Sequence, residues 1–265
     1  MLNRPLILTL LALAATPAGA AEYPCLIEPN QLLKLAAAVS GVITDVEVAR
    51  GDRVKKGQVL ARLDSEVEEA NAQIAQVRAA NDTALKSGKA RLDFLKRKQT
   101  RNEKLHVTDA ASFAQLDEAT SDAMVAAAQL QEAELNLAQA RLEAQRAGGL
   151  LRQRRVISPV DGIITERSLG PGEFRNDQAT ILTVAEMDPL RVETYLPIAL
   201  HGHINVGDRI EVLPEAPIGG AFTATVSVVD QVFDAASGTI GVRLRLPNPN
   251  FRLPAGIHCR VRLAE

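Results

Sequence analysis

Apolar residues recur at spacings of three and four along the stretch from Ser65 to Ala147, as in a helix that packs one face against a partner helix. The C-terminal half carries an unbroken row: Leu116, Ala119, Ala123, Ala126, Leu130, Ala133, Leu137, Ala140, Ala144 and Ala147. The N-terminal half fits less cleanly, with Val67, Ala70, Ile74 and Val77 and then, beyond Asn81, a shifted set of Leu85, Gly88, Leu92 and Leu95. We interpret the slip of frame as a stutter.

The row of apolar residues is interrupted around Lys104–Ser112, where the chain has room to reverse. Ser112 with Gln115 has the spacing of a capping box, and Ser65 with Glu68 repeats that spacing at the start of the stretch. The pattern therefore predicts an antiparallel coiled-coil hairpin over residues 65–154. Each arm has about 40 residues, so the hairpin is roughly 60 Å long at 1.5 Å per residue.

A repeat of strand-forming segments flanks this hairpin. The segment from Gly41 to Leu60 aligns at a constant offset with the segment from Gly162 to Ile181, and each turns at a Gly-Asp or Gly-Glu pair. Neither half is long enough to bury a core alone. We therefore expect residues 36–64 and 155–187 to fold together as one β-sandwich from which the hairpin projects.

The remaining residues, 188–265, alternate short apolar strands with Gly- and Pro-rich turns. The predicted strands are Leu190–Leu196, Arg209–Leu213, Ala221–Val229, Thr239–Leu246 and Ile257–Leu263. About this number of strands suggests a small β-barrel. We expect residues 21–35 to add a strand to it.

The first 20 residues have the features of a secretory signal peptide: a positive start, an apolar run and an Ala-Gly-Ala cleavage site at residues 18–20. The alternative is an uncleaved membrane anchor, but the apolar run is shorter than the about 20 residues that span a bilayer. The prediction is an exported, soluble protein without another transmembrane segment.

Cys25 and Cys259 are the two cysteines, and both lie in strand-like runs near the ends of the mature chain. In an oxidising compartment such a pair is expected to be bridged, and two separately buried thiols are the alternative. The formal net charge of −2 argues against nucleic acid as a partner.

The sequence shows no constellation typical of an enzyme, a metal site or a carried cofactor. His201 and His203 form a conceivable metal pair on one strand face, but no third ligand lies nearby. A biotinyl or lipoyl carrier needs a lysine on a tight turn, and Leu63–Ser65 leads into the helical stretch instead. We expect no enzymatic activity, no metal and no cofactor.

The two glycine-marked halves resemble a split biotinyl/lipoyl domain. With the hairpin inserted in it, the chain resembles the periplasmic adaptor (membrane fusion, HlyD/RND-type) proteins of tripartite efflux pumps. Residues 158–162 (Ser-Pro-Val-Asp-Gly) and the segment Pro247–Gly256 are similar to landmarks of that family. The resemblance implies an α+β fold: a coiled-coil hairpin in a split lipoyl-like β-sandwich, followed by a small β-barrel.

Arg101, Leu105 and Ser112 also stand at the spacing R-x3-L-x6-S, which is similar to the hairpin-tip motif of such adaptors. The resemblance implies that these residues engage a TolC-like outer-membrane channel. Purely structural roles are the alternative: Ser112 as a helix cap, Leu105 packed in a last turn, and Arg101 as a cation near a helix C-terminus.

The resemblance implies an adaptor that bridges an inner-membrane transporter and the outer-membrane channel. An RND-type transporter is the preferred partner. Several copies of the adaptor are expected to associate in a ring. In the first alternative the adaptor serves an ABC-type exporter. In the second alternative the chain is a carrier subunit of a biotin- or lipoate-dependent enzyme. Larger adaptors carry a membrane-proximal domain after the barrel, and this sequence ends at Glu265 without one. We therefore expect the barrel or another subunit to contact the transporter.

Overall fold

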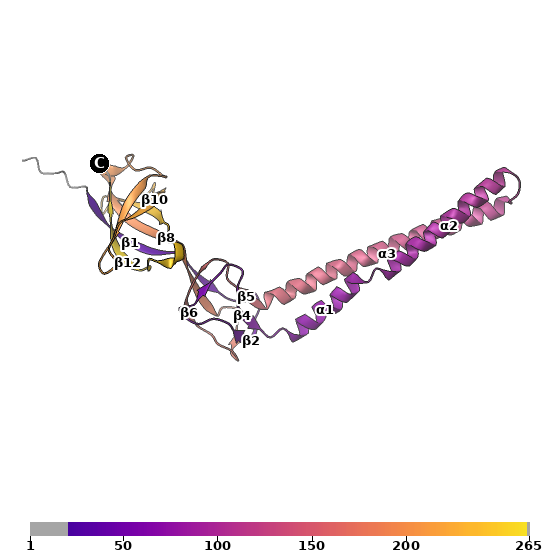
Figure 1. Ribbon diagram of the computed structural model, residues 1–265, viewed down its shortest axis with the longest axis horizontal. Coiled ribbons are helices and arrows are strands. Elements are labelled where there is room, and N and C mark those ends of the chain that lie inside the picture. Colours follow the sequence, from indigo (N-terminus) through magenta and orange to yellow (C-terminus); the bar gives the residue numbers. More distant parts are fainter. Residues whose placement is uncertain (1–20, 264–265) are drawn as a thin grey trace, which may run out of the picture. The chain divides into compact units, whose positions relative to one another are not determined.

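The structure is a computed structural model and describes residues 21–263 (Figure 1). The predicted signal peptide lies outside the described residues. The predicted fold class is confirmed: the chain contains a helical hairpin, a lipoyl-like β-sandwich and a β-barrel. These elements form two compact units, residues 34–184 and residues 21–33 with 185–263.

The lipoyl-like sandwich is built from the two halves of the repeat. Its first half contributes β2 (Gly41–Val46), β3 (Arg53–Val54) and β4 (Val59–Leu63), and its second half contributes β5 (Arg155–Ile157), β6 (Gly162–Arg167), β7 (Phe174–Arg175) and the start of β8 (Leu182–Pro197). One sheet has the order β5-β4-β2-β7, and β3 pairs with β6. Apolar side chains from both halves fill the core, among them Ile43, Leu60, Leu63, Ile164, Ile181 and Leu182.

The two halves hold each other through matching hydrogen bonds. The amide of Gly51 donates to the carbonyl of Ile164, and the amide of Gly172 donates to the carbonyl of Ile43, both at 2.8 Å. Both glycines have positive φ angles, 95° and 84°, which a residue with a side chain rarely adopts. The glycines that mark the repeat are therefore required by the turns through which each half bonds to the other.

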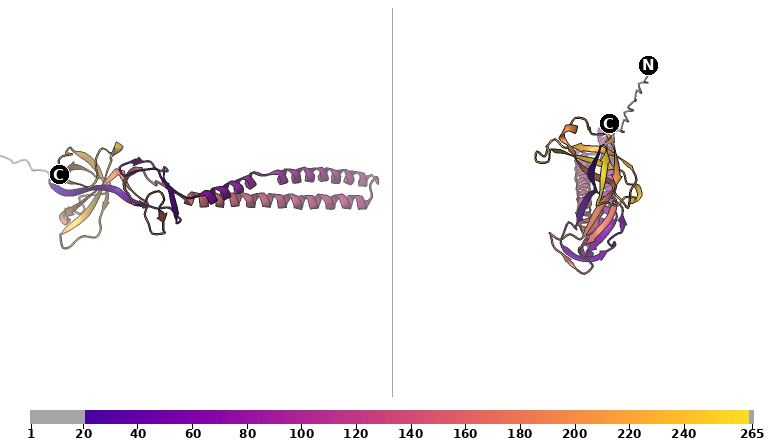
Figure 2. Two further views of the ribbon diagram at one scale, coloured as in Figure 1. Left: turned by 90° about the horizontal axis from the view of Figure 1, so that it is seen from below. Right: turned by 90° about the vertical axis from the view of Figure 1, so that its left-hand side faces the viewer.

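The hairpin consists of α1 (Glu66–Ala80), α2 (Thr83–Val107) and α3 (Phe113–Gln153), with α1 and α2 forming one arm and α3 the other (Figure 2). The first arm is interrupted at Asn81, which has an extended backbone, and Asp82 then becomes the N-cap residue of α2. The stutter interpretation is therefore wrong, because the frame shift occurs through a break in the helix.

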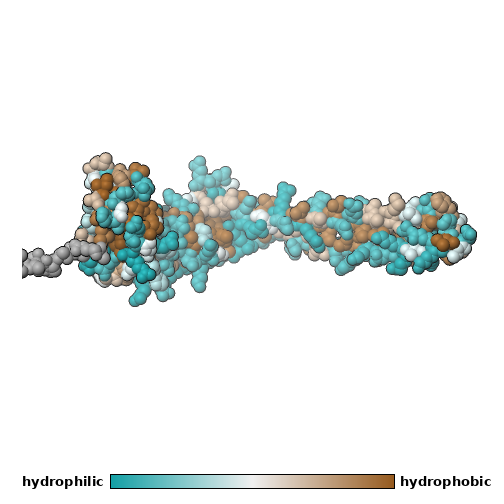
Figure 3. Space-filling model, turned by 90° about the horizontal axis from the view of Figure 1, so that it is seen from above, coloured by the Kyte–Doolittle hydropathy of each residue, from teal (hydrophilic) through white to brown (hydrophobic). Residues whose placement is uncertain are grey.

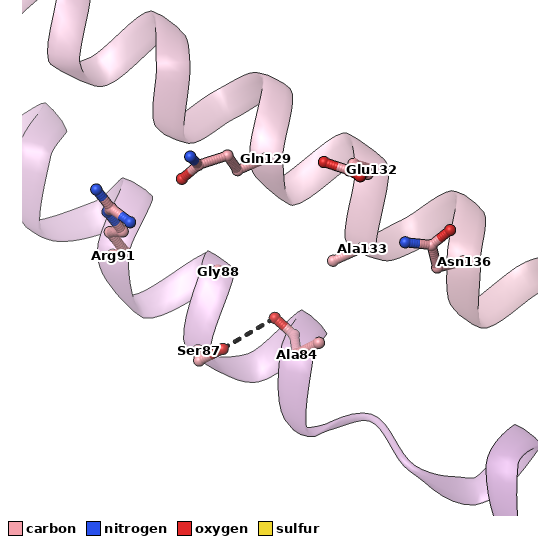
Figure 4. A pocket seen from close by; sticks show the side chains of 8 residues that line it. All are labelled: Ala84, Ser87, Gly88, Arg91, Gln129, Glu132, Ala133 and Asn136. Atoms are coloured by element: carbon pink, nitrogen blue, oxygen red, sulfur yellow. Dashed lines mark hydrogen bonds between the residues drawn. The ribbon is translucent and has the colours of Figure 1, made fainter.

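The predicted row on α3 is confirmed, since Ala119, Ala123, Ala126 and Leu137 are buried. The shifted row on α2 is also confirmed: Leu92 is buried, and Leu85, Gly88 and Leu95 are half-buried. An added Cβ at Gly88 would lie 3.5 Å from Cδ1 of Leu130, so α2 and α3 approach closely there. Beside this contact a shallow groove of about 420 Å³ opens between the two helices (Figure 4).

The predicted row on α1 is wrong. Val67, Ile74 and Val77 are exposed by 67%, 53% and 67%, and Ala70 is exposed as well. The residues turned toward α3 are instead Glu68, Ala72, Ala75 and Ala79, again at spacings of three and four. The salt bridge between Glu68 and Arg154, with 2.5 Å between Oε1 and Nη2, explains this rotation of α1.

The predicted capping box at the start of α1 is also wrong. Ser65 is the N-cap residue, but its hydroxyl donates to the carboxylate of Glu69 rather than accepting a backbone amide. Glu68, the expected second member of the box, is engaged by Arg154. The carboxylate of Glu68 is therefore bound to Arg154 and does not accept the backbone amide of Ser65, as a capping box requires.

The barrel has six strands in the order β1-β12-β9-β10-β11-β8, and it closes because β1 also pairs with β8. Its further strands are β1 (Glu22–Leu35), β9 (Arg209–Pro214), β10 (Phe222–Val229), β11 (Thr239–Leu246) and β12 (Ile257–Arg262), with 3-10 turns at Ile198–Leu200 and Pro249–Phe251. Alternate residues on each strand point inward, as β11 shows. Fully buried apolar side chains fill the interior, among them Ile27, Leu190, Leu196, Val212, Ile240, Leu244, Leu246 and Val261.

Asn248 has a structural role in the segment Pro247–Gly256, which the sequence analysis compared with a family landmark. Its buried amide donates to the carbonyls of Met187 (2.8 Å) and Leu253 (2.9 Å), and its oxygen accepts the amide of Leu253 (2.8 Å). Every polar atom of this side chain is thus bonded, as burial requires. Asn248 therefore stabilises the loop that connects β11 to β12.

The terminal strands of the barrel are joined in three ways. β1 and β12 are antiparallel partners, Cys25 lies opposite Cys259, and a disulfide links the two with 4.8 Å between their Cα atoms. Arg262 and Arg260 also bind Glu22, and the hydrogen bond from Arg262 is the main reason why the pKa of Glu22 lies below its usual value.

The two histidines of the candidate metal pair lie in a turn after the Ile198–Leu200 segment and not on a strand. The ring of His201 packs edge-on against Phe233, with 4.8 Å between ring centroids. Within residues 21–263 no group of three His, Cys, Asp or Glu side chains is arranged to hold a metal ion. No helix in that range is both long and apolar enough to cross a membrane.

Candidate functional site

The tip of the hairpin is a short turn held together by backbone hydrogen bonds. At the end of α2 the carbonyl of Leu105 accepts the amide of Ala110 at 2.8 Å and the hydroxyl of Thr108 at 3.0 Å. Asp109 adopts a left-handed conformation with φ of 53°, which Asp tolerates better than most residues. His106 closes the turn, with Nδ1 3.0 Å from the carbonyl oxygen of Ala111. These bonds fix where the side chains of the tip lie.

Ser112 begins the returning helix and forms the predicted capping box, which is confirmed. Its hydroxyl accepts the amide of Gln115 at 3.3 Å, and its own amide donates to the side-chain oxygen of Gln115 at 3.0 Å. These two bonds satisfy donors that a helix start otherwise leaves unpaired. Ser112 is also exposed. It therefore combines a structural role with accessibility to a partner.

Arg101 and Leu105 lie four residues apart on α2, so they share one face of the helix. Leu105 is 40% exposed, and Arg101 is exposed. The structure therefore brings Arg101 and Leu105 together on the outer surface of α2 near the tip, with Ser112 at the start of the neighbouring helix. It assigns no partner to them, so their predicted contact with a channel stays a prediction.

Arg101 belongs to a basic groove on α2. The groove has a volume of about 380 Å³ and is lined by Lys96, Arg97, Thr100, Arg101 and Lys104. Lys98, on the other side of the helix, pairs with Asp122 at 3.1 Å and Glu118 at 3.9 Å on α3. In the described part of the chain the four cations of the groove form no such ion pair. They are therefore available to an acidic partner.

Two apolar residues of the tip were missed by the sequence analysis. Val107 is 85% exposed and Phe113 is 71% exposed, one on each side of the turn. The ring of Phe113 contacts that of His106 edge-on, with 6.3 Å between centroids. The signal that pointed to them was available, because two large apolar residues flank a polar turn. Together with Leu105 they give the tip an apolar end beside the basic groove.

Two family descriptions match the chain. The CzcB-like barrel-sandwich hybrid domain matches residues 31–186, and the CusB-like β-barrel domain matches residues 191–265. The first match alone covers more than half of the sequence. It contains the repeat, the hairpin and the tip residues described above.

Several curated relatives agree with these matches. A macrolide export protein, MacA, of Escherichia coli O157:H7 is 29% identical over 230 residues, which are 82% of this chain and 60% of MacA. An uncharacterized protein of Haemophilus influenzae is 27% identical over 242 residues, 90% of this chain and 56% of that protein. The chain thus spans a little under two thirds of the length of these relatives.

Among solved structures, MacA of Actinobacillus actinomycetemcomitans has the same fold, with a TM-score of 0.68 and 23% identity over 93% of this chain and 79% of that one. The membrane fusion protein Spr0693 of Streptococcus pneumoniae R6 gives a TM-score of 0.61 at 14% identity, over 93% and 99% of the two chains. The fold and the family matches define a protein of the adaptor class rather than an enzyme. The chain belongs to the periplasmic adaptor (membrane fusion) proteins of tripartite efflux pumps.

Proposed function

We propose that this protein is the periplasmic adaptor of an RND-type efflux system and bridges an inner-membrane transporter to a TolC-like outer-membrane channel. The observation that carries the proposal is the tip: Arg101 and Leu105 are presented on one exposed face at the end of a long two-helix arm. The tip of such a long hairpin lies far from the β-sandwich, so its exposed side chains do not stabilise that domain. Binding of a partner protein would explain why the hairpin is so long.

The second partner is a transporter in the inner membrane. The match of residues 191–265 to the CusB-like RND β-barrel domain supports an RND-type transporter. An ABC-type exporter is the alternative, and relatives named as a macrolide export protein and a multidrug resistance protein support export of small molecules in either case. We propose that the adaptor works in the periplasm, and that several copies form a ring.

The adaptor acts by binding. Its tips hold the channel open only if they bind the open form more tightly than the closed form. The hydrogen bonds of the turn favour docking as such, because little conformational freedom is lost when a preorganised tip binds.

The test is resistance to an exported drug in cells that depend on this adaptor. We expect Arg101→Asp, Leu105→Arg and Ser112→Arg to abolish resistance while adaptor abundance in the periplasm stays unchanged. Leu150→Arg and Arg78→Asp are matched controls, because Leu150 is exposed by 47% and Arg78 is also exposed, and both lie away from the tip. Full resistance in all three tip variants would overturn the proposed contact.

A further inference from the structure

One end of the barrel, where β1 begins, is lined by apolar side chains. Along a strand, alternate residues face inward, as the buried Cys25 and Ile27 do on β1. Tyr23 belongs to the same inward-facing set and is half-buried. Ile210 on β9 and Leu263, directly after β12, continue the inward-facing sets of their own strands. These positions form the mouth of the barrel.

A cavity of about 610 Å³ lies at this mouth. Five apolar or aromatic side chains line it: Tyr23, Leu200, Ile204, Ile210 and Leu263. Small-molecule sites are mostly apolar hollows of roughly 300–1,000 Å³, and the mouths of β-barrels are among the places where they occur. Apolar side chains are also visible at the surface of the barrel in Figure 3. The cavity therefore has the size and the lining of a small-molecule site.

The segment between β8 and β9 forms one wall of the cavity and is held by hydrogen bonds. The amide of Asn205 donates to Oδ2 of Asp208 at 2.7 Å. The amide of Gly207 donates to the carbonyl of Val226 on β10 at 2.9 Å, and the amide of Val226 donates to the carbonyl of Asp208 at 2.8 Å. This wall is therefore preorganised, which reduces the conformational entropy that a ligand has to overcome on binding.

The polar groups of the cavity are mainly hydrogen-bond donors. Tyr23, His203 and Arg209 line it, and their side chains form no hydrogen bond or ion pair within residues 21–263. Asp208 is the carboxylate among the lining residues, and its Oδ2 already accepts the amide of Asn205. Free donors thus outnumber free acceptors. The cavity favours a ligand whose polar end accepts hydrogen bonds.

Arg209 favours a negative charge at that polar end. Its guanidinium remains protonated in a protein and offers five N–H donors in a planar fork. Such a fork binds the two oxygens of a carboxylate in parallel. Arg209 is exposed, beside the apolar part of the lining. An apolar molecule with a carboxylate at one end therefore matches both parts of the cavity.

We propose that the mouth of the barrel is a binding site for a small amphipathic carboxylate. The apolar body of the ligand packs against Leu200, Ile204 and Ile210, and its carboxylate binds Arg209. Tyr23 and His203 supply further donors. The inference goes beyond the proposed function, because a protein that bridges a transporter to a channel needs no ligand of its own.

The test is isothermal titration calorimetry of the purified exported protein with laurate, below the concentration at which laurate forms micelles. We expect one laurate to bind per chain. Dodecyltrimethylammonium has an alkyl chain of the same length and the opposite charge. We expect it to bind at least about tenfold more weakly, because it offers Arg209 no acceptor.

Two variants of the rim test the sign of the charge. Arg209→Gln weakens laurate binding about tenfold, because a charged hydrogen bond is lost. Asp208→Asn keeps an oxygen for the amide of Asn205 and removes a negative charge from the lining, so laurate binds more tightly. Arg245→Gln is the matched control: Arg245 is exposed on β11 and lies outside the lining, so we expect no change.

A third variant tests the apolar part of the cavity. Leu200→Trp fills the cavity, so we expect laurate binding to be lost while the protein stays folded. Thermal unfolding of every variant shows whether it has kept its fold. If Leu200→Trp does not fold, the comparison of Arg209→Gln with Arg245→Gln still decides the proposal.

Several results would overturn the proposal. They are the absence of laurate binding, equal binding of the two surfactants, and unchanged affinity in Arg209→Gln. Sedimentation with phosphatidylglycerol vesicles tests a different role of the same end of the barrel. Binding to these vesicles without binding of free laurate would mean that the barrel recognises a membrane surface, and it would also overturn the proposal.

The outcome is separable from that of the proposed function, because calorimetry needs neither transporter nor channel. Laurate binding combined with drug resistance in the tip variants rejects the channel contact and keeps this site. Loss of resistance in the tip variants without laurate binding keeps the channel contact and rejects this site.

Discussion

Glu68 and Arg154 form a salt bridge across the base of the hairpin, with 2.5 Å between Oε1 and Nη2. Glu68 lies in the first turn of α1, and Arg154 is the C-cap residue of α3. Both side chains are largely buried, with 21% and 24% of their surface exposed. Nη1 of Arg154 also donates to the carbonyl of Ser40 at 3.4 Å, in the lipoyl-like sandwich. The pair thus joins both ends of the hairpin and sets the rotation of α1.

The first prediction concerns this pair. Glu68→Gln lowers the free energy of unfolding by about 1 kcal/mol, because Arg154 keeps its partial burial and loses a charged acceptor. Urea unfolding followed by circular dichroism measures the loss. We expect the variant carrying both Arg154→Glu and Glu68→Arg to be less destabilised than the sum of its two single variants, which a double-mutant cycle measures.

Glu69→Gln is the matched control, since the carboxylate of Glu69 accepts only the Ser65 hydroxyl among the contacts of the described chain. We expect little effect from it. Equal losses from Glu68→Gln and Glu69→Gln would show that the bridge contributes nothing specific.

Gly88 gives the second prediction. Glycine costs roughly 0.5–1 kcal/mol in a helix interior relative to alanine. An added Cβ lies 3.5 Å from Cδ1 and 3.6 Å from Cα of Leu130, which is ordinary van der Waals contact. We therefore expect Gly88→Ala to raise the free energy of unfolding by about 1 kcal/mol, measured by thermal unfolding.

A larger side chain at the same position has the opposite effect. Gly88→Phe does not fit beside Leu130 and separates α2 from α3, so its unfolding midpoint falls. A midpoint for Gly88→Ala below that of the native chain would mean that the close approach at this position has no room for a methyl group.

The third prediction concerns the disulfide, which we propose forms in the exported protein. It links residues 234 positions apart, so it restricts the unfolded chain over most of its length. Replacing both Cys25 and Cys259 by Ser costs about 2–4 kcal/mol of stability. We expect dithiothreitol to lower the unfolding midpoint of the native chain and to leave that of the double variant unchanged. Two reactive thiols in the native, non-reduced protein would refute the bridge.

Much of the fold was predictable because it depends on local patterns. The apolar row on α3 predicts a closely packed pair of helices, because alanine and leucine recur on it at strict spacings of three and four. The glycines at 51 and 172 likewise marked turns that only positive φ angles allow. Both signals can be identified from residue types and spacings along the chain and need no knowledge of distant contacts.

The rotation of α1 was not predictable in the same way. The sequence favours the face of α1 that carries Val67, Ile74 and Val77 over the face that carries Glu68 and Ala72. The first face has the larger apolar side chains, whose burial is normally favoured. The choice depends on Arg154, which is 86 residues away in sequence from Glu68. The tip was located from the spacing of three residues, whereas Val107 and Phe113 were recognised from their exposure, although two large apolar residues beside a polar turn were visible in the sequence.

The last prediction separates the two roles of Ser112. Removing the cap with Ser112→Ala costs about 1 kcal/mol, and Ser112→Asn keeps the cap, because asparagine caps as well as serine does. Thermal unfolding measures both. Ser112→Arg also lacks a capping oxygen, so its stability equals that of Ser112→Ala, but it adds bulk and charge where we propose that the channel docks. We therefore expect Ser112→Ala to keep most drug resistance and Ser112→Arg to lose it at equal adaptor abundance. If Ala and Arg at this position gave the same resistance, the serine would act on the helix alone, and the channel contact at the tip would rest on Arg101 and Leu105.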